Sequence, residues 1–179
     1  LINGDTFSGT YTGAFNNANV GTNKTVTITP TYSGADVGNY SVTDQSTATG
    51  NIVAKTLTAT ASTANKVYDG NTTATTTLTF TGLVGSETLG QTVGSTFNNK
   101  NVGTGKAVTV NSITLTDGTG LATNYSISPG QTTTANVTAK ALTVSGITAS
   151  NKIYDGNTVA TIDISTINYG GLVGGDDVV

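Results

Sequence analysis

Cysteine, histidine, methionine and tryptophan are all absent from this chain of 179 residues, and arginine is absent as well. Without cysteine the chain forms no disulfide and has no thiolate. Without histidine or cysteine it lacks the usual bases and nucleophiles near neutral pH. Paired carboxylates would be the remaining catalytic device, but no two aspartates fall on predicted facing strands. We therefore expect that the protein is not an enzyme.

Charge is also scarce. Charged residues make up 9% of the chain, against about 25% in an average globular protein. The net charge is −3, and the seven basic residues are all lysines that form no cluster. This argues against binding nucleic acid or an acidic membrane face. No run of about 18 apolar residues predicts a membrane-spanning helix.

The chain instead contains a repeated turn. Lys66–Thr72 reads Lys-Val-Tyr-Asp-Gly-Asn-Thr, and Lys152–Thr158 repeats it with one change, 86 residues later. Asp-Gly and Gly-Asn tolerate positive φ, so the pattern predicts strand, tight turn, strand. The residues of this structural repeat motif are Tyr68, Asp69, Gly70, Tyr154, Asp155 and Gly156.

Four further segments recur at offsets of 82 to 89 residues, which is typical of a domain repeat with variable loops. They are Phe15–Thr22 with Phe97–Thr104, Asn39–Val42 with Asn124–Ile127, Ala54–Thr58 with Ala139–Thr143, and Gly82–Gly85 with Gly171–Gly174. We predict a partial repeat at 1–55, a complete repeat at 56–140 and a partial repeat at 141–179. Because the chain opens in mid-repeat without an initiator Met, we expect a piece of a longer polymer.

Apolar and polar residues alternate along the complete repeat, as at Val108 and Val110 or at Ala135 and Val137. Period-2 alternation predicts strands with one buried face, and no stretch shows helical periodicity. About seven short antiparallel strands in 85 residues predict an immunoglobulin-like β-sandwich, and the repeats predict an extended tandem array. The buried parity reverses at Lys55 and at Lys140, which predicts that successive sandwiches are turned over along a slender rod.

The turn motif, together with Asn101–Thr104 and Asn124–Tyr125, resembles the YDG-type repeats of large bacterial surface proteins, which are similar to mostly bacterial immunoglobulin-like (MBG-like) repeats. The resemblance covers the whole chain. It implies a secreted or cell-surface location, in adhesins or filamentous-haemagglutinin-type exoproteins that function in cell adhesion and biofilms.

Asp69, Asp155 and Asp176 are candidate calcium ligands. Calcium takes six to eight oxygens, usually from several carboxylates, so we favour a hydrogen-bonded turn and expect no cofactor. Tyr68 and Tyr154 could bind sugar, but their apolar neighbours, Val67 and Ile153, favour a role in the core or at the edge of the sandwich.

Two structural alternatives concern other recurring residues. Tyr40 and Tyr125 are candidates for a tyrosine corner. Lys66 or Lys106 could form an isopeptide bond, which we disfavour because the chain's single Glu, Glu87, falls in a predicted loop.

The resulting hypothesis is a structural stalk or filament-forming repeat of a bacterial adhesin or extracellular matrix fibre. The alternative is a surface-binding module that recognises glycan or another surface, with ice the less favoured because Thr-rich strands are ordinary β structure. The expected partners are neighbouring repeats of the same chain, or further subunits that complete each half-sandwich by strand addition.

Overall fold

The computed structural model describes residues 1–177, and these residues form strands, turns and two short 3-10 turns, Val37–Asn39 and Ala122–Asn124. None of them lies in an α-helix, so the predicted all-β class is confirmed. The cause is the composition, since threonine and valine suit a pleated surface and glycine disfavours helix. In the described residues no helix has the length and apolar character needed to cross a membrane.

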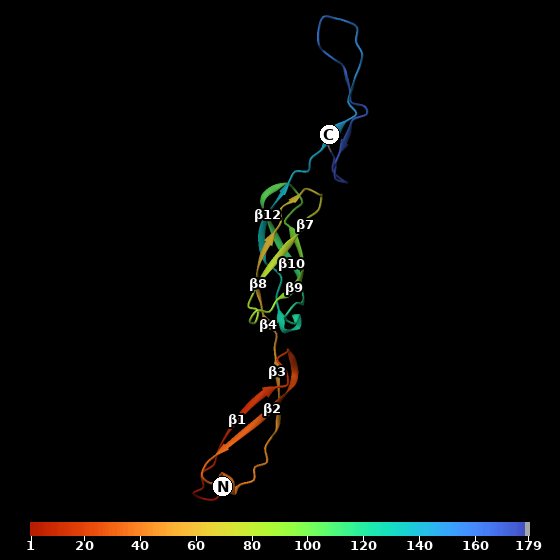
Figure 1. Ribbon diagram of the computed structural model, residues 1–179. Helices are drawn as coiled ribbons and strands as arrows, with labels where there is room; N and C mark the ends of the chain where they lie inside the picture. The colour runs from red at the N-terminus through yellow and green to blue at the C-terminus, as the bar shows by residue number, and fades with distance from the viewer. Residues whose placement is uncertain (178–179) are drawn as a thin grey trace. The chain divides into compact units, whose positions relative to one another are not determined.

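The chain divides into two compact units, and Figure 1 draws strands of both. The first comprises residues 1–58, 81–90 and 115–127, and the second comprises residues 59–80, 91–114 and the chain from 128 on. These limits do not coincide with the repeat boundaries predicted at residues 55 and 140, which stay a prediction.

The first unit contains an antiparallel sheet of three strands, in the order β1 (Ser8–Phe15), β2 (Gly21–Ser33) and β3 (Thr47–Ile52). Phe15 lies opposite Val26, and Gly21 lies opposite Ile52. In this unit β4 (Lys55–Thr56) also pairs with β11 (Tyr125–Ser126). Both outer strands of the three-stranded sheet, β1 and β3, have a single neighbour among residues 1–177.

The second unit contains a five-stranded sheet. Its order is β6 (Lys66–Val67), β12 (Thr132–Thr138), β10 (Gly103–Asp117), β9 (Leu89–Phe97) and β7 (Thr73–Ala74). Three two-stranded pairs accompany it: β5 (Thr58–Thr63) with β8 (Thr76–Thr81), β13 (Thr143–Ser145) with β16 (Asn168–Gly170), and β14 (Thr148–Ala149) with β15 (Ile162–Asp163).

Two pairs correct the expectation of purely antiparallel strands. β6 runs parallel to β12, and β4 runs parallel to β11, each over two residues. Both short strands come directly after an extended segment that crosses from one sheet to another. They therefore reach their partner without the hairpin that antiparallel neighbours use.

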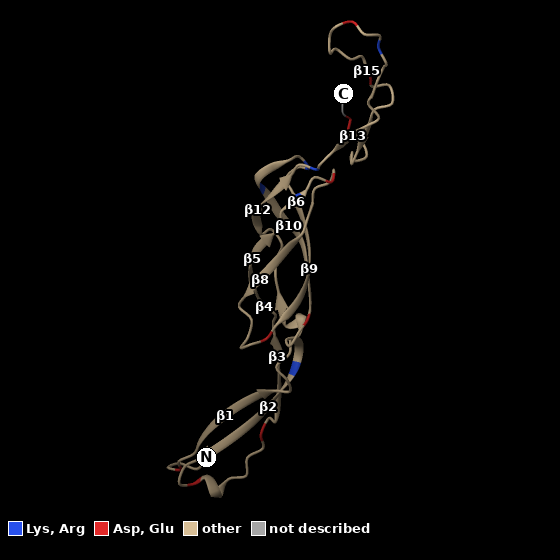
Figure 2. Ribbon diagram, turned by 45° about the horizontal axis from the view of Figure 1, so that its top comes forward, with Lys and Arg blue, Asp and Glu red and all other residues tan. Residues whose placement is uncertain are grey.

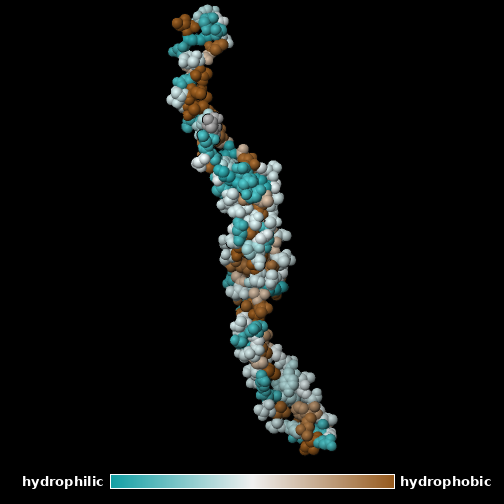
Figure 3. All heavy atoms as spheres, turned by 180° about the vertical axis from the view of Figure 1, so that it is seen from behind, coloured by the Kyte–Doolittle hydropathy of each residue, from teal (hydrophilic) through white to brown (hydrophobic). Residues whose placement is uncertain are grey.

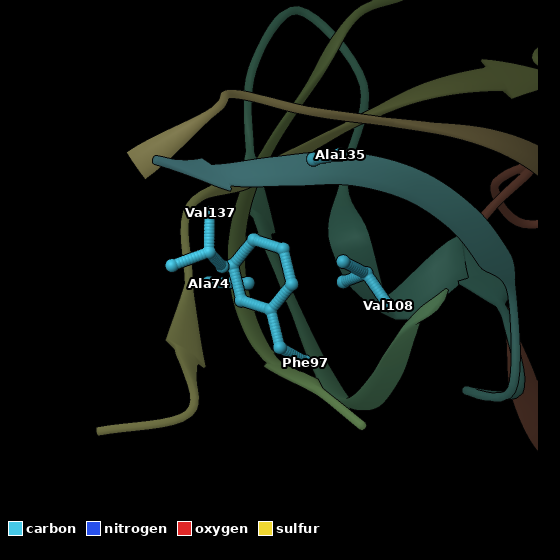
Figure 4. Packing of buried hydrophobic residues seen from close by; sticks show 5 residues of the cluster. All are labelled: Ala74, Phe97, Val108, Ala135 and Val137. Atoms are coloured by element: carbon cyan, nitrogen blue, oxygen red, sulfur yellow. The ribbon is translucent and has the colours of Figure 1, made fainter. Parts of the chain in front are cut away.

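The core of the second unit lies on one face of the five-stranded sheet (Figure 4). The Phe97 ring lies between Val137 and Val108, and Ala74 and Ala135 complete the cluster, with Tyr68 packed against it. The predicted alternation is confirmed here, because Val108, Val110 and Val137 are all almost fully buried. Burial of these side chains is the main stabilising term of such a small core.

The predicted reversal of buried parity is confirmed at Lys55. Ile52 and Ala54 are partly buried on even positions, whereas Leu57 and Ala59 are buried or partly buried on odd ones. At Lys140 the reversal stays a prediction, because Leu142 and Val144 are both exposed.

Candidate functional site

The repeated turn is organised around a lysine. The Lys66 ammonium donates to the Asn71 carbonyl at 3.1 Å, to the Asn71 side-chain oxygen at 3.0 Å and to the Thr73 carbonyl at 3.0 Å. It also pairs with the Asp69 carboxylate at 2.7 Å and lies 5.8 Å from the centre of the Phe97 ring. One side chain thus closes the whole turn, and we call this arrangement a lysine clamp.

The Asp69 carboxylate accepts further hydrogen bonds within the turn. It accepts the Asn71 N–H at 3.1 Å and the Asn71 side-chain amide at 2.9 Å. The hydrogen bond from Lys66, with these bonds from Asn71, lowers the pKa of Asp69. Gly70 has φ +79°, as predicted, because the turn needs a left-handed residue between Asp69 and Asn71.

The second copy of the turn forms the same bonds. Lys152 reaches the Asn157 carbonyl at 3.0 Å, the Asn157 side-chain oxygen at 2.8 Å and the Val159 carbonyl at 2.9 Å. It pairs with Asp155 at 2.8 Å, and Gly156 has φ +73°. Since the whole of 148–163 is exposed, the clamp forms from local bonds alone and does not depend on a surrounding core.

Lysines also hold the two asparagine-rich loops, one after β9 and its repeat equivalent after β1. Lys106 donates to the side-chain oxygen of Asn99 and to the Asn101 carbonyl, the latter at 2.6 Å. Lys24 makes the same pair of bonds 82 residues earlier, to Asn17 and to the Asn19 carbonyl. Four of the seven lysines therefore hold turns, and the charged residues lie scattered along the chain (Figure 2).

The recurring Asn-Tyr-Ser tyrosines anchor a distant loop. The Tyr125 hydroxyl accepts the Val84 N–H at 3.0 Å and donates to Glu87, and this bond raises the pKa of Tyr125. Tyr40 repeats the arrangement with the Ile2 N–H and Asp5. The expected tyrosine corner is wrong, because such a corner bonds to backbone a few residues upstream, whereas these partners lie 35 to 41 residues away.

Asp176, a predicted calcium candidate, lies beside the predicted motif residue Tyr68. The Tyr68 hydroxyl donates to Asp176 at 2.9 Å, and Lys100 lies 3.5 Å from the same carboxylate and 5.9 Å from the Tyr68 ring centre. The neighbouring Tyr68 hydroxyl and the charge of Asp176 raise the pKa of Lys100. These residues line an open hollow of about 500 Å³ with Val102 and Val173.

The first unit contains an equivalent hollow of about 330 Å³. Its lining includes Asn19, Val20, Val84 and Glu87, which are the repeat equivalents of Asn101, Val102, Val173 and Asp176 in the hollow of the second unit. Here the side chain of Asn124 accepts the Val20 N–H at 2.8 Å and donates to Asn19 at 3.1 Å. In both units the asparagine loop of one repeat and the Gly-Leu-Val-Gly loop of the next therefore line the same hollow.

The three calcium candidates do not form a common site. No group of three acidic side chains converges anywhere in residues 1–177. A calcium ion at Asp69 or Asp155 would have to displace the ammonium that already pairs with that carboxylate. The Tyr-Asp-Gly residues thus serve the turn, and Tyr68 also packs on the core as predicted. For Tyr154 the same prediction is wrong in this structure, because its side chain is 94% exposed and no core surrounds it among the described residues.

Comparison with family models places the sequence in a known family. The model of the YDG domain matches three segments, residues 1–49, 53–135 and 138–179. The chain belongs to the YDG domain family. No curated protein and no solved structure matches it. We call the two clamped turns, Lys66–Thr73 and Lys152–Val159, the YDG turns.

The lysine of each YDG turn holds the turn together, a role that the sequence pattern did not predict. Lys66 and Lys152 stand three residues before Asp69 and Asp155 in both copies. That recurrence was visible, but a lysine in a polar segment is usually a solvated surface residue. The pairing of Tyr68 with Asp176, 108 residues apart, had no local signal.

Proposed function

We propose that this chain is part of a structural stalk, a tandem array of immunoglobulin-like β-sandwich repeats in a bacterial cell-surface adhesin or extracellular matrix fibre. Its membership of the YDG domain family and its all-β fold support this proposal. The proposed location is extracellular, and the proposed partners are neighbouring repeats.

One observation carries the proposal, namely a hollow between adjacent repeats that recurs with the sequence period. Asn19 and Val20 line it with Val84 and Glu87 in one unit, and their equivalents line it together in the other. An arrangement that repeats with the sequence period can continue along a chain of any length, which is what a stalk requires. For a binding module we would instead expect surface aromatic or acidic residues that occur in one repeat alone.

The polar groups of the turns support the same proposal. The YDG turn directs its carboxylate, its amide and its lysine at one another. Groups that satisfy each other in this way rigidify the backbone. We infer that the turns are stiffeners, and we expect no catalytic activity.

Small-angle X-ray scattering of a series of chains with two, three and four repeats tests the proposal. β10 has 15 residues, so at about 3.3 Å per residue a repeat spans roughly 50 Å. The maximum dimension, extrapolated to zero concentration, should grow linearly by about that length per repeat.

A compact arrangement gives a different result, because the radius of gyration of a globule would be about 16 Å at 179 residues and would rise slowly with length. That outcome would contradict the stalk. A glycan array probed with the same chains covers the alternative function, and selective binding of one glycan class would favour the binding module.

A further inference from the structure

The first YDG turn joins opposite edges of one sheet. On one side Val67 runs parallel to Thr138, and the Tyr68 N–H donates to the Thr138 carbonyl at 2.8 Å. On the other side Ala74 lies opposite Ser95. The turn therefore straddles the three strands β12, β10 and β9, and it adds a short strand, β6 or β7, to each outer edge.

The same turn closes the core. Ala74 and Tyr68 come from the turn segment, and they pack against Phe97, Val108 and Val137 from the three longer strands. The core of this repeat thus has two halves, one on the turn segment and one on the three-stranded sheet (Figure 4).

The sheet β1-β2-β3 carries the second half of such a core. Its Phe15, Val26 and Ile52 are the repeat equivalents of Phe97, Val108 and Val137, and the pairing of β2 with β3 repeats the register of β10 with β12. Phe15 is 41% exposed, however, whereas Phe97 is 3% exposed. In residues 1–177 no short strand flanks this sheet on either edge.

The segment 142–164 carries the first half. Tyr154 is 94% exposed and Ile164 is 60% exposed, although Leu78, the equivalent of Ile164, is 3% exposed. The YDG turn within this segment already has its complete lysine clamp. Hydrophobic atoms, brown in Figure 3, are correspondingly open to solvent in the C-terminal part of the chain.

We propose that the second YDG turn of one copy of this chain docks on the β1-β2-β3 sheet of another copy and completes a repeat there. The first YDG turn prescribes the register. Lys152 and Ile153 add parallel to Ile52 and Val53, and Val159 and Ala160 add antiparallel to Gly13 and Ala14, so Ala160 faces Gly13. This inference rests on the proposed function and deepens it by naming the partner.

Two physical features favour this partner. Covering an exposed strand edge or an exposed apolar face lowers the free energy of the protein. Here the sheet has free edges and an exposed apolar face, and the YDG turn segment has the short strands and apolar side chains that would cover them. The turn also arrives preorganised, with its charge neutralised by the Lys152–Asp155 pair, so less conformational entropy is lost on docking. Because the two surfaces differ, the contact is heterologous and adds copies head to tail.

Analytical ultracentrifugation of the 179-residue chain tests the pairing. We expect the weight-average sedimentation coefficient to rise with concentration, without a limiting dimer. Ala160→Asp should lower the association constant by at least about a hundredfold, because Ala160 is the equivalent of buried Ala74 and a charge there would be desolvated unpaired.

Thr161→Asp is the matched control. Thr161 is the neighbour of Ala160 and is also exposed, but its equivalent, Thr75, is exposed in the complete repeat. This variant adds the same charge and should associate as the parent chain does. Neither side chain is buried in the single chain, so neither variant should affect its folding.

Hydrogen exchange supplies a local readout. The Phe97 N–H donates to the Thr72 carbonyl of the first YDG turn at 2.8 Å. The equivalent Phe15 N–H should therefore gain protection as the chain associates, through the Thr158 carbonyl of the docked copy, and Ala160→Asp should abolish that gain.

A chain that stays monomeric at every concentration overturns the proposal, and a monomer with a protected Phe15 amide would mean that the chain closes on itself. Association that survives Ala160→Asp, or that Thr161→Asp also abolishes, overturns it as well. None of these results affects the stalk, which stands or falls on the growth of the maximum dimension with repeat number.

Discussion

Replacing Lys66 with Met should loosen the first YDG turn from its sheet while the rest of the core stays folded. Methionine keeps a long apolar stem beside Phe97 but removes the ammonium. The ammonium makes three hydrogen bonds, to two acceptors of Asn71 and one of Thr73, from a side chain that is 17% exposed. The variant therefore removes the clamp with little change in packing volume.

The expected cost follows from the accessibility of the acceptors. A hydrogen bond to a charged group contributes about 1.5–3 kcal/mol net when its partner would otherwise be unsatisfied. Asn71 and Thr73 are exposed, so water can replace most of the lost bonds. We expect the free energy of opening the turn to fall by about 1–3 kcal/mol, which is roughly the contribution of one hydrogen bond to a charged group.

Native-state hydrogen exchange measures this loss at the right place. The Phe97 N–H is bonded to the Thr72 carbonyl inside the turn, so its protection reports whether the turn is attached. A loss of 1–3 kcal/mol lowers that protection about 5- to 140-fold. The Val110 N–H, bonded to the Gln131 carbonyl away from the turn, should change much less.

Lys152→Met is the matched control, because it removes the same clamp from the second YDG turn. It should leave the exchange of the Phe97 amide unchanged. The reasoning is refuted if Lys66→Met leaves Phe97 protected as before. It is also refuted if protection falls equally at Phe97 and Val110, because the lysine would then support the whole core and not the attachment of the turn.

Three further predictions concern the same turns and the loop anchor. Gly70→Val should destabilise its repeat by about 1–3 kcal/mol in thermal unfolding, because φ is +79° and a Cβ would lie 2.7 Å from Val173; an unchanged melting temperature would show an ordinary position. Asp69 should titrate below its usual pKa of 3.8 in carbon-detected NMR, owing to the hydrogen bond from Lys66. Since its folded pKa is the lower one, its stabilisation is complete above pH 3.8 and disappears as the pH falls through the folded value, so a midpoint at or above 3.8 contradicts the clamp. Tyr125 should ionise above its usual pKa of 10.0 in an ultraviolet titration, because its hydroxyl donates to Glu87, and Glu87→Gln should move that midpoint back down.

The sequence alone determined the features that depend on near neighbours. Alternation at Val108 and Val110 predicted buried strand faces, and the structure buries both. Asp-Gly-Asn predicted a left-handed glycine, and Gly70 has positive φ. Period and turn chemistry act over a few residues, so a single sequence carries them in full.

The lysine clamps are also local, with Lys66 five residues from Asn71, yet the pattern did not predict them. A lysine in a polar loop can adopt many rotamers in solvent, and its residue type does not distinguish a solvated ammonium from one held by three acceptors. The acceptors become clear only when the backbone of the turn has a definite conformation.

Only the tertiary structure decided which strands meet. β6 and β7 are two residues long, and they pair with residues that lie 71 and 21 to 23 positions away along the chain. A two-residue strand is too short to show period-2 alternation in the sequence. A parallel pair also lacks the short hairpin turn by which an antiparallel pair can be predicted. In these pairings Tyr68 and Ala74 pack with Phe97 and Val137 and shield them from solvent. That packing depends on the shape of the folded core, and no short stretch of sequence contains this information.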